Sequence, residues 1–149
     1  MLFFAQNTFA QSKKEVKKNA IKTCTITDTE NNKTINNKKT TFDKNGETVE
    51  ETDYKKDGSF KTTHKYKFNK DGDEIEEEEY NDKNVLTEKK ITKYNSFGEK
   101  SEEQFYDGAG KLIKTHVYTY NDKGLKIERK TLDATGKTIG VRKYIYEYK

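Results

Sequence analysis

Two kinds of segment alternate along the chain from about residue 20 onward. Runs of seven to ten residues rich in Thr, Tyr, Val and Ile favour β-strands, and short segments rich in Asn, Asp and Gly separate them. Residues 12–19 are predicted to be a polar linker, either as a short frayed helix or without regular structure. The alternation predicts strands over residues 20–28, 34–42, 47–54, 59–68, 73–80, 85–94, 99–106, 111–120, 125–132 and 138–148.

The segments between the strands share one pattern: an aromatic residue or Leu, usually Asn or Asp, two further residues, and Gly or Asn. Their first positions are 42, 54, 68, 80, 94, 106, 120 and 132, so the spacing alternates between 12 and 14 residues in a 26-residue double repeat. Asn or Asp followed three residues later by Gly is typical of a type I turn that ends in a bulge. A degenerate ninth turn is expected over residues 28–32. The sequence therefore predicts an all-β fold, an antiparallel hairpin meander of about ten strands in a curved or partly rolled sheet.

Two columns of charged residues recur at the repeat interval and predict the register of the strands. Three-residue turns with a single bulge place each acid opposite a base, which favours pairing across antiparallel strands. Glu77 is then expected on the opposite face from Glu76. The predicted structural pairs are Glu50 with His64, Glu76 with Lys90, Glu102 with His116, and Glu128 with Arg142.

The composition of the chain narrows the classes of protein to which it could belong. A length of 149 residues is enough for one domain, here residues 20–149. The low content of Val, Ile, Leu and Phe beside 38% charged residues would indicate disorder if the repeat were absent. The net charge is only +4 and both signs are mixed along the chain, which is not typical of a nucleic-acid-binding protein. No apolar run approaches the length of a transmembrane helix, and no cofactor-binding motif is present.

The beginning of the chain has the character of a targeting segment. Residues 1–11 are apolar and then small, and basic residues follow from Lys13. This resembles the later part of a secretory signal peptide, so we expect a partial signal peptide and a mature chain that starts near Gln11. The alternative is an apolar terminus that packs onto the fold. Cys24 is the only cysteine, and its setting among threonines favours a small packed residue over a reactive thiol.

Residues Tyr118 to Leu125 resemble the Tyr-x-Tyr-Asp-x-x-Gly-x-Leu core of the YD, or RHS, repeat. Weaker copies lie at residues 66–72 and 144–146, and the resemblance extends over roughly residues 28–149. It implies a sheet built from hairpins and an exported or surface location. The chain is too short to enclose a cargo and lacks proline, so it departs from the large toxin members of that family.

Candidate chemistry is sparse. His64 and His116 stand at repeat positions where other copies have Lys or Arg, which favours a structural role over catalysis, and the chain is predicted not to be an enzyme. Asp43, Asn45 and Asp71 resemble part of a calcium loop, but turn chemistry explains them equally well. Five tyrosines with basic neighbours form either a stacking face for a sugar or peptide or the packing of the sheet itself: Tyr66, Tyr118, Tyr120, Tyr144 and Tyr146.

These features favour a secreted, periplasmic or cell-surface repeat protein that serves as a non-catalytic binding or structural module. The alternative is an immunity or accessory partner of an RHS-type secretion or toxin system, and a hydrolase fragment ranks third. The ligand is expected to be a protein or a carbohydrate. Self-association through edge strands is a further expected contact.

Overall fold

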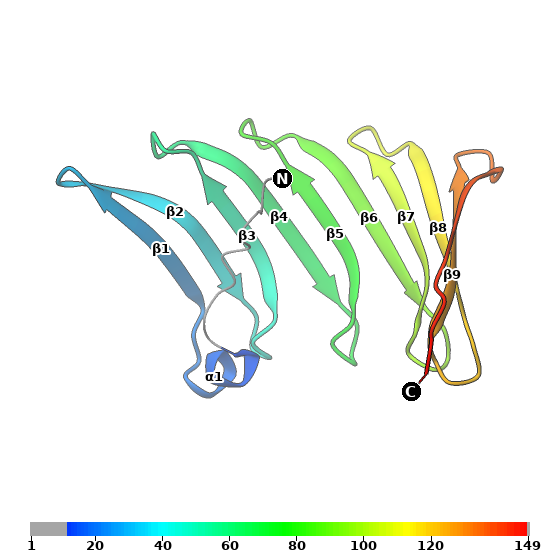
Figure 1. Cartoon of the computed structure of the whole chain (residues 1–149). Helices are drawn as coiled ribbons and strands as arrows, with labels where there is room; N and C mark the ends of the chain where they lie inside the picture. Colours follow the sequence, from blue (N-terminus) through cyan, green and yellow to red (C-terminus); the bar gives the residue numbers. More distant parts are fainter. Residues whose placement is uncertain (1–11, 149) are drawn as a thin grey trace.

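Ten antiparallel strands lie side by side in chain order and form one open, curved sheet in the computed structural model, which describes residues 12–148 (Figure 1). Within that range β1 and β10 each have one neighbour, and one short helix accompanies the sheet. The predicted all-β meander is confirmed. The elements are α1 (Lys13–Lys18), β1 (Thr23–Glu30), β2 (Lys33–Phe42), β3 (Thr48–Tyr54), β4 (Phe60–Phe68), β5 (Glu74–Tyr80), β6 (Leu86–Tyr94), β7 (Lys100–Asp107), β8 (Leu112–Tyr120), β9 (Lys126–Asp133) and β10 (Thr138–Lys143).

The eight repeated segments form turns of one kind, as their sequences predict. In the β8–β9 turn, the Asn121 side chain accepts hydrogen bonds from the Lys123 and Leu125 amides, and the Gly124 amide donates to the Asn121 carbonyl. The glycines of seven turns have φ between 71° and 87°, a region that glycine enters without steric cost. Asn84 takes this position in the eighth turn, with φ 57°.

The first hairpin differs from the others. Its turn is formed by Asn31 and Asn32, which both have positive φ (49° and 62°), as in a two-residue type I′ turn. The predicted degenerate turn over residues 28–32 therefore lies at the end of that range, and β1 continues to Glu30.

A second irregularity in each of the eight repeated hairpins sets the register. Tyr54 lies opposite Phe60, as predicted, but the next pair is Asp53 with Thr62, so Lys61 has no partner. The same one-residue shift follows the other repeated turns of the sheet. The outgoing strand of each hairpin, which is the strand that follows the turn, is therefore displaced by one residue from the register that a single bulge would give.

The predicted acid–base pairs are wrong by this one residue. Because the unpaired residue lies in the outgoing strand, the bases lie opposite the acids one position further along, and Glu77 lies on the same face as His64 and Lys90. The observed partners are Lys65 for Glu50, Ile91 for Glu76, Val117 for Glu102 and Lys143 for Glu128, while His64, Lys90, His116 and Arg142 face Glu51, Glu77, Glu103 and Arg129.

Three tyrosines link neighbouring double repeats through the backbone beside these shifts. The hydroxyl of Tyr94 donates to the Glu74 carbonyl at 2.9 Å, and Tyr120 makes the same bond to Lys100 at 2.8 Å. Tyr146 repeats it with Lys126 at 2.7 Å. Each accepting carbonyl belongs to the first residue of a strand, directly before the unpaired position, where a ladder partner is missing.

The sheet has almost no apolar core among the described residues. Val16 (1% exposed) and Phe42 (8% exposed) are the buried apolar side chains, and Thr40, Thr52, Thr92 and Thr115 are buried polar ones. Val16 belongs to α1, whose N-terminus is capped by Ser12 and Glu15. Of the two alternatives expected for residues 12–19, the structure has the short helix, and its single buried apolar side chain, Val16, anchors it.

We predict that Tyr120→Phe lowers the free energy of unfolding by about 0.5–1.5 kcal/mol, since the Lys100 carbonyl loses its donor. Urea unfolding followed by circular dichroism measures the change. Tyr106→Phe is the matched control, because among the described residues the Tyr106 hydroxyl bonds only to the Gln104 side chain two residues away. Equal losses in the two variants would contradict a special role for the carbonyl bond.

Candidate functional site

Nine residues spaced thirteen apart cross one face of the sheet, and we call them the charge ladder. Members directly opposite each other on neighbouring strands point to the same face. From the first to the seventh, bases and acids alternate; the last two are both arginines. The ladder comprises Lys38, Glu51, His64, Glu77, Lys90, Glu103, His116, Arg129 and Arg142.

The middle of the ladder is neutralised by its own contacts. Glu77 lies 3.3 Å from the His64 ring and 2.5 Å from the Lys90 ammonium, which also contacts Glu74 at 3.0 Å. The hydrogen bonds from His64 and Lys90 lower the pKa of Glu77 to about 2 against the opposing effect of burial. Burial opposes the charge of Lys90, but its bonds to Glu77 and Glu74 raise its pKa to about 12. The hydrogen bond to Glu77 likewise raises the pKa of His64.

The alternation ends at Arg129, which stands where the preceding repeats have glutamate. Arg129 and Arg142 lie directly opposite each other, and neither forms an ion pair within residues 12–148. The Nε atom of Arg129 is buried and has no hydrogen-bond partner there. Like charges directly opposite each other destabilise a sheet, so an anion near this pair would stabilise it.

The pKa of His116 reflects the positive charge of Arg129 at this ladder position. Burial lowers its pKa, and the positive charge of Arg129 lowers it further, whereas the equivalent His64 has a raised pKa. Glu103 does not compensate for Arg129, because it is occupied by the Tyr118 hydroxyl and by Lys100 at 2.6 Å. The His116 ring lies 3.7 Å from Glu103, and its Nδ1 atom has no hydrogen-bond partner among the described residues.

Aromatic rings and a lysine flank the two arginines. Tyr118 lies opposite Arg129, and Tyr144 follows Arg142 by two residues. The Lys126 ammonium lies 4.4 Å from the centre of the Tyr118 ring and 5.9 Å from that of Tyr144, a cation–π arrangement. We call His116, Lys126, Arg129 and Arg142, with the rings of Tyr118 and Tyr144, the cationic end. Guanidinium groups bind carboxylate, sulfate and phosphate with paired hydrogen bonds, so this site is suited to an oxyanion.

The five tyrosines predicted to form a ligand face do not lie together and do not make the same contacts. Tyr118 and Tyr144 meet around Lys126, but Tyr66 lies two double repeats away, with its hydroxyl 3.5 Å from Glu51. The hydroxyls of Tyr120 and Tyr146 are bonded to backbone carbonyls. Arg129 was missed because the acid column was placed one residue early. Comparison of residues 51, 77, 103 and 129 would have revealed the exception.

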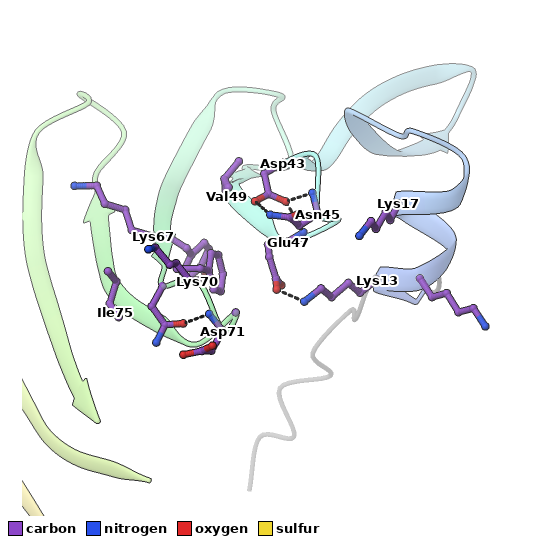
Figure 2. Close-up of a pocket in the computed structure, with 15 residues that line it drawn as sticks. Lys13, Lys17, Asp43, Asn45, Glu47, Val49, Lys67, Lys70, Asp71 and Ile75 are labelled. Atoms are coloured by element: carbon purple, nitrogen blue, oxygen red, sulfur yellow. Dashed lines mark hydrogen bonds and ion pairs between the residues drawn. The ribbon is translucent and has the colours of Figure 1, made fainter. Parts of the chain in front are cut away.

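A groove of about 940 Å³ lies between α1, the β2–β3 turn and the β4–β5 turn (Figure 2). Lys13 of α1 forms an ion pair with Glu47, and α1 approaches the turn so closely that a Cβ atom at Gly46 would lie 2.6 Å from the Lys13 carbonyl oxygen. The groove contains Asp43, Glu47 and Asp71 as well as five lysines. Its charges are mixed, so it favours no ligand class.

A second groove, of about 660 Å³, lies 52 residues further along the chain, between the β6–β7 and β8–β9 turns. It is the repeat equivalent of the first, but α1 has no counterpart there. Tyr118 and Tyr120 line it, and Phe97, which is 86% exposed, stands where the first groove has Asn45. An exposed aromatic surface therefore adjoins the cationic end.

The described residues form no site for the other chemistries considered, which are metal binding and a reactive thiol. Within residues 12–148 no group of three His, Cys, Asp or Glu side chains is arranged to hold a metal ion, and no helix is long and apolar enough to span a membrane. Asp43 and Asn69 accept hydrogen bonds from the backbone of their own turns. Cys24 is half-buried in β1, with a free thiol.

Comparison with known proteins identifies no family. No family model and no curated protein matches the chain. A Bacteroides fragilis protein of unknown function is similar over 85% of this chain and 96% of its own, with 13% identity and a TM-score of 0.46. TarM of S. aureus shares 20% identity over 89% of this chain (TM-score 0.35), and a GtfA/B complex bound to UDP and GlcNAc shares 15% over 80% (TM-score 0.31). This chain covers 24% of each of those two chains. At these scores the likenesses say nothing about function.

We predict that Arg129→Glu raises the pKa of His116, because the substitution replaces a repelling charge with an attracting one. Titration of the histidine ring signals by NMR measures the effect. His64 is the internal control, since its partner Glu77 is untouched and its pKa should stay constant. An unchanged pKa at His116 would show that burial alone depresses it.

We predict that Glu77→Gln lowers stability most above pH 5. The folded pKa of Glu77 is about 2 and its ordinary value is 4.5, so its stabilising contribution is present above pH 4.5 and lost as the pH falls through 2. The difference from the native protein should therefore shrink between pH 5 and about pH 2 in urea unfolding. Glu50→Gln is the control, because Glu50 forms no ion pair within the described residues. A pH-independent difference would contradict the assignment.

Proposed function

We propose that the protein is an exported, non-catalytic binding module of the cell envelope or extracellular space, and that it binds an anionic ligand at the cationic end. The observation that carries this proposal is the break of the charge ladder at Arg129. Six sheet strands compensate their ladder charges, and the last two place arginines side by side with a buried, unpartnered Nε atom. A buried polar atom without a partner is costly, and natural proteins tolerate such a cost chiefly at functional sites.

The non-catalytic part of the proposal rests on the repeat. His64 and His116 occupy ladder positions held by Lys38, Lys90 and Arg142 in other copies. A general acid or base needs a pKa near the working pH, which lysine and arginine do not supply at the same position. The two histidines therefore serve as members of the charge ladder and not as catalytic groups.

Export rests on residues 1–11, which lie outside the described residues, and on the resemblance to YD/RHS repeats. We predict that the native protein is found outside the cytoplasm and begins near Gln11. Cell fractionation followed by intact-mass measurement checks both points. A cytoplasmic protein that retains Met1 would overturn the export proposal and leave the binding proposal standing.

Anion binding is tested with inorganic sulfate as the probe, followed by NMR of backbone amides and arginine Nε–H groups. We expect saturable shifts at Arg129 and Arg142. Arg129→Gln should weaken binding about tenfold, because a charge-assisted hydrogen bond contributes about 1.5–3 kcal/mol.

Lys143→Gln is the matched control for the sulfate titration. It removes the same charge from the neighbouring position of β10, but Lys143 lies opposite Glu128 on the other face of the sheet. Sulfate binding should persist in this variant. Equal weakening by both substitutions would indicate a nonspecific effect of net charge and would overturn the assigned site.

A further inference from the structure

The open edge of β10 displays hydrogen-bonding backbone beside the cationic end. Tyr144 donates its amide to the Ile127 carbonyl of β9 at 3.0 Å. Because successive residues of a strand direct their backbone groups alternately to the two sides, Val141, Lys143 and Ile145 direct theirs away from β9. Within residues 12–148 no strand lies on that side. Such an edge is a template for another strand.

Apolar side chains on the same edge are also uncovered. Val141 is 52% exposed and Ile145 is 89% exposed, and both lie on the face opposite to Arg142. Interior strands of the sheet have a neighbour on each side. A strand added to β10 would cover these side chains on one face and lie beside Arg142 and Tyr144 on the other.

The repeat itself indicates what that strand should carry. In the first two double repeats the basic residue of a long strand contacts a glutamate on the following strand, Lys38 with Glu51 at 3.4 Å and His64 with Glu77 at 3.3 Å. Arg142 has arginine on its β9 side, and no strand of residues 12–148 lies on its other side. On the pattern of these two double repeats, a strand beside β10 would place an acidic residue next to Arg142.

We propose that the cationic end and the edge of β10 together bind an extended acidic segment of a partner protein, which adds to the sheet as an antiparallel strand. Its carboxylate lies beside Arg142 and Arg129, and its alternate side chains cover Val141 on the other face. This inference rests on the proposed anion-binding function and specifies its ligand. Main-chain hydrogen bonds supply affinity in such strand addition, and alternate side chains supply specificity.

A second copy of this chain fits the edge less well. Its β1 strand, which has one neighbour among residues 12–148, carries Thr25 at the position that corresponds to Glu51, so in the register of the repeat it places no carboxylate beside the arginines. A sulfated polysaccharide would supply anions but would leave the backbone of β10 unpaired. An acidic strand would both supply a carboxylate to the arginines and pair with the backbone of β10.

The test uses a peptide with the sequence of residues 99–107, which contains β7. In the sheet, β6 pairs Thr92 with Glu103 and Lys89 with Tyr106, and these β6 residues stand 52 positions before Tyr144 and Val141. The same register on β10 puts the peptide's glutamate diagonal to Arg142 and its tyrosine opposite Val141. We expect saturable NMR shifts along β10, slowed exchange of the Val141 and Lys143 amides, and antiparallel intermolecular contacts.

Two variants separate strand addition from simple attraction of charge. Lys143→Pro removes an outward-facing donor at an edge position where proline is tolerated, so it should abolish peptide binding while sulfate still binds. A peptide with lysine in place of the glutamate equivalent to Glu103 should bind at least about tenfold more weakly. If the proline variant does not fold, a peptide N-methylated at its alternate backbone amides tests the same bonds on the native protein.

Each result of these binding experiments either supports or overturns the proposed strand addition. Peptide binding that survives Lys143→Pro or N-methylation would overturn it, as would sulfate binding with no peptide binding, which would leave the proposed function intact. A dimer in sedimentation experiments that dissociates on Lys143→Pro would show that a second copy occupies the edge. Failure of both sulfate and peptide to bind would overturn the proposed function as well.

Discussion

The register between neighbouring strands is the constraint on which the rest of this structure depends. Each repeated hairpin combines a turn that ends in a left-handed residue with one further unpaired residue in the outgoing strand. Since side chains alternate between the faces, that single extra residue decides which glutamates meet the bases. It places Glu77, rather than Glu76, beside His64 and Lys90. The charge ladder is a direct consequence of this turn geometry.

A sheet with so little buried apolar surface needs other sources of cohesion. Hydrophobic burial contributes little here, because Val16 and Phe42 are the buried apolar side chains among the described residues. The repeat supplies cross-strand contacts instead, such as the Thr52–Thr63 hydrogen bond at 3.2 Å and the stacked rings of Tyr54 and Phe60 at 5.4 Å. Contacts of this kind are individually small, but in a repeat each one recurs and stabilises the next unit.

The proposed site arises where this repetition stops. Arg129 in place of glutamate converts a neutral part of the ladder into one with uncompensated positive charge, and the opposite pKa shifts of His64 and His116 reflect the difference. Exposed Phe97 in the β6–β7 turn, Val141 in β10 and Ile145 just after β10 lie at or near the same end of the sheet. Positive charge, aromatic rings and unpaired backbone therefore coincide at this end of the sheet.

The sequence alone determined the fold class, the turns and the number of strands, because glycine and asparagine at regular intervals act locally and need no tertiary context. It also identified Tyr118, Tyr144, His116 and Arg142 as members of recurring columns. The pairing of those columns was decided only by the tertiary structure. The unpaired residue after each turn is not marked by one residue type, since Lys61, Ile75 and Ser101 all occupy such positions and resemble ordinary strand residues. The sequence consequently placed the acids one residue early, and the structure revealed Arg129, since only the three-dimensional register shows which side chains face one another.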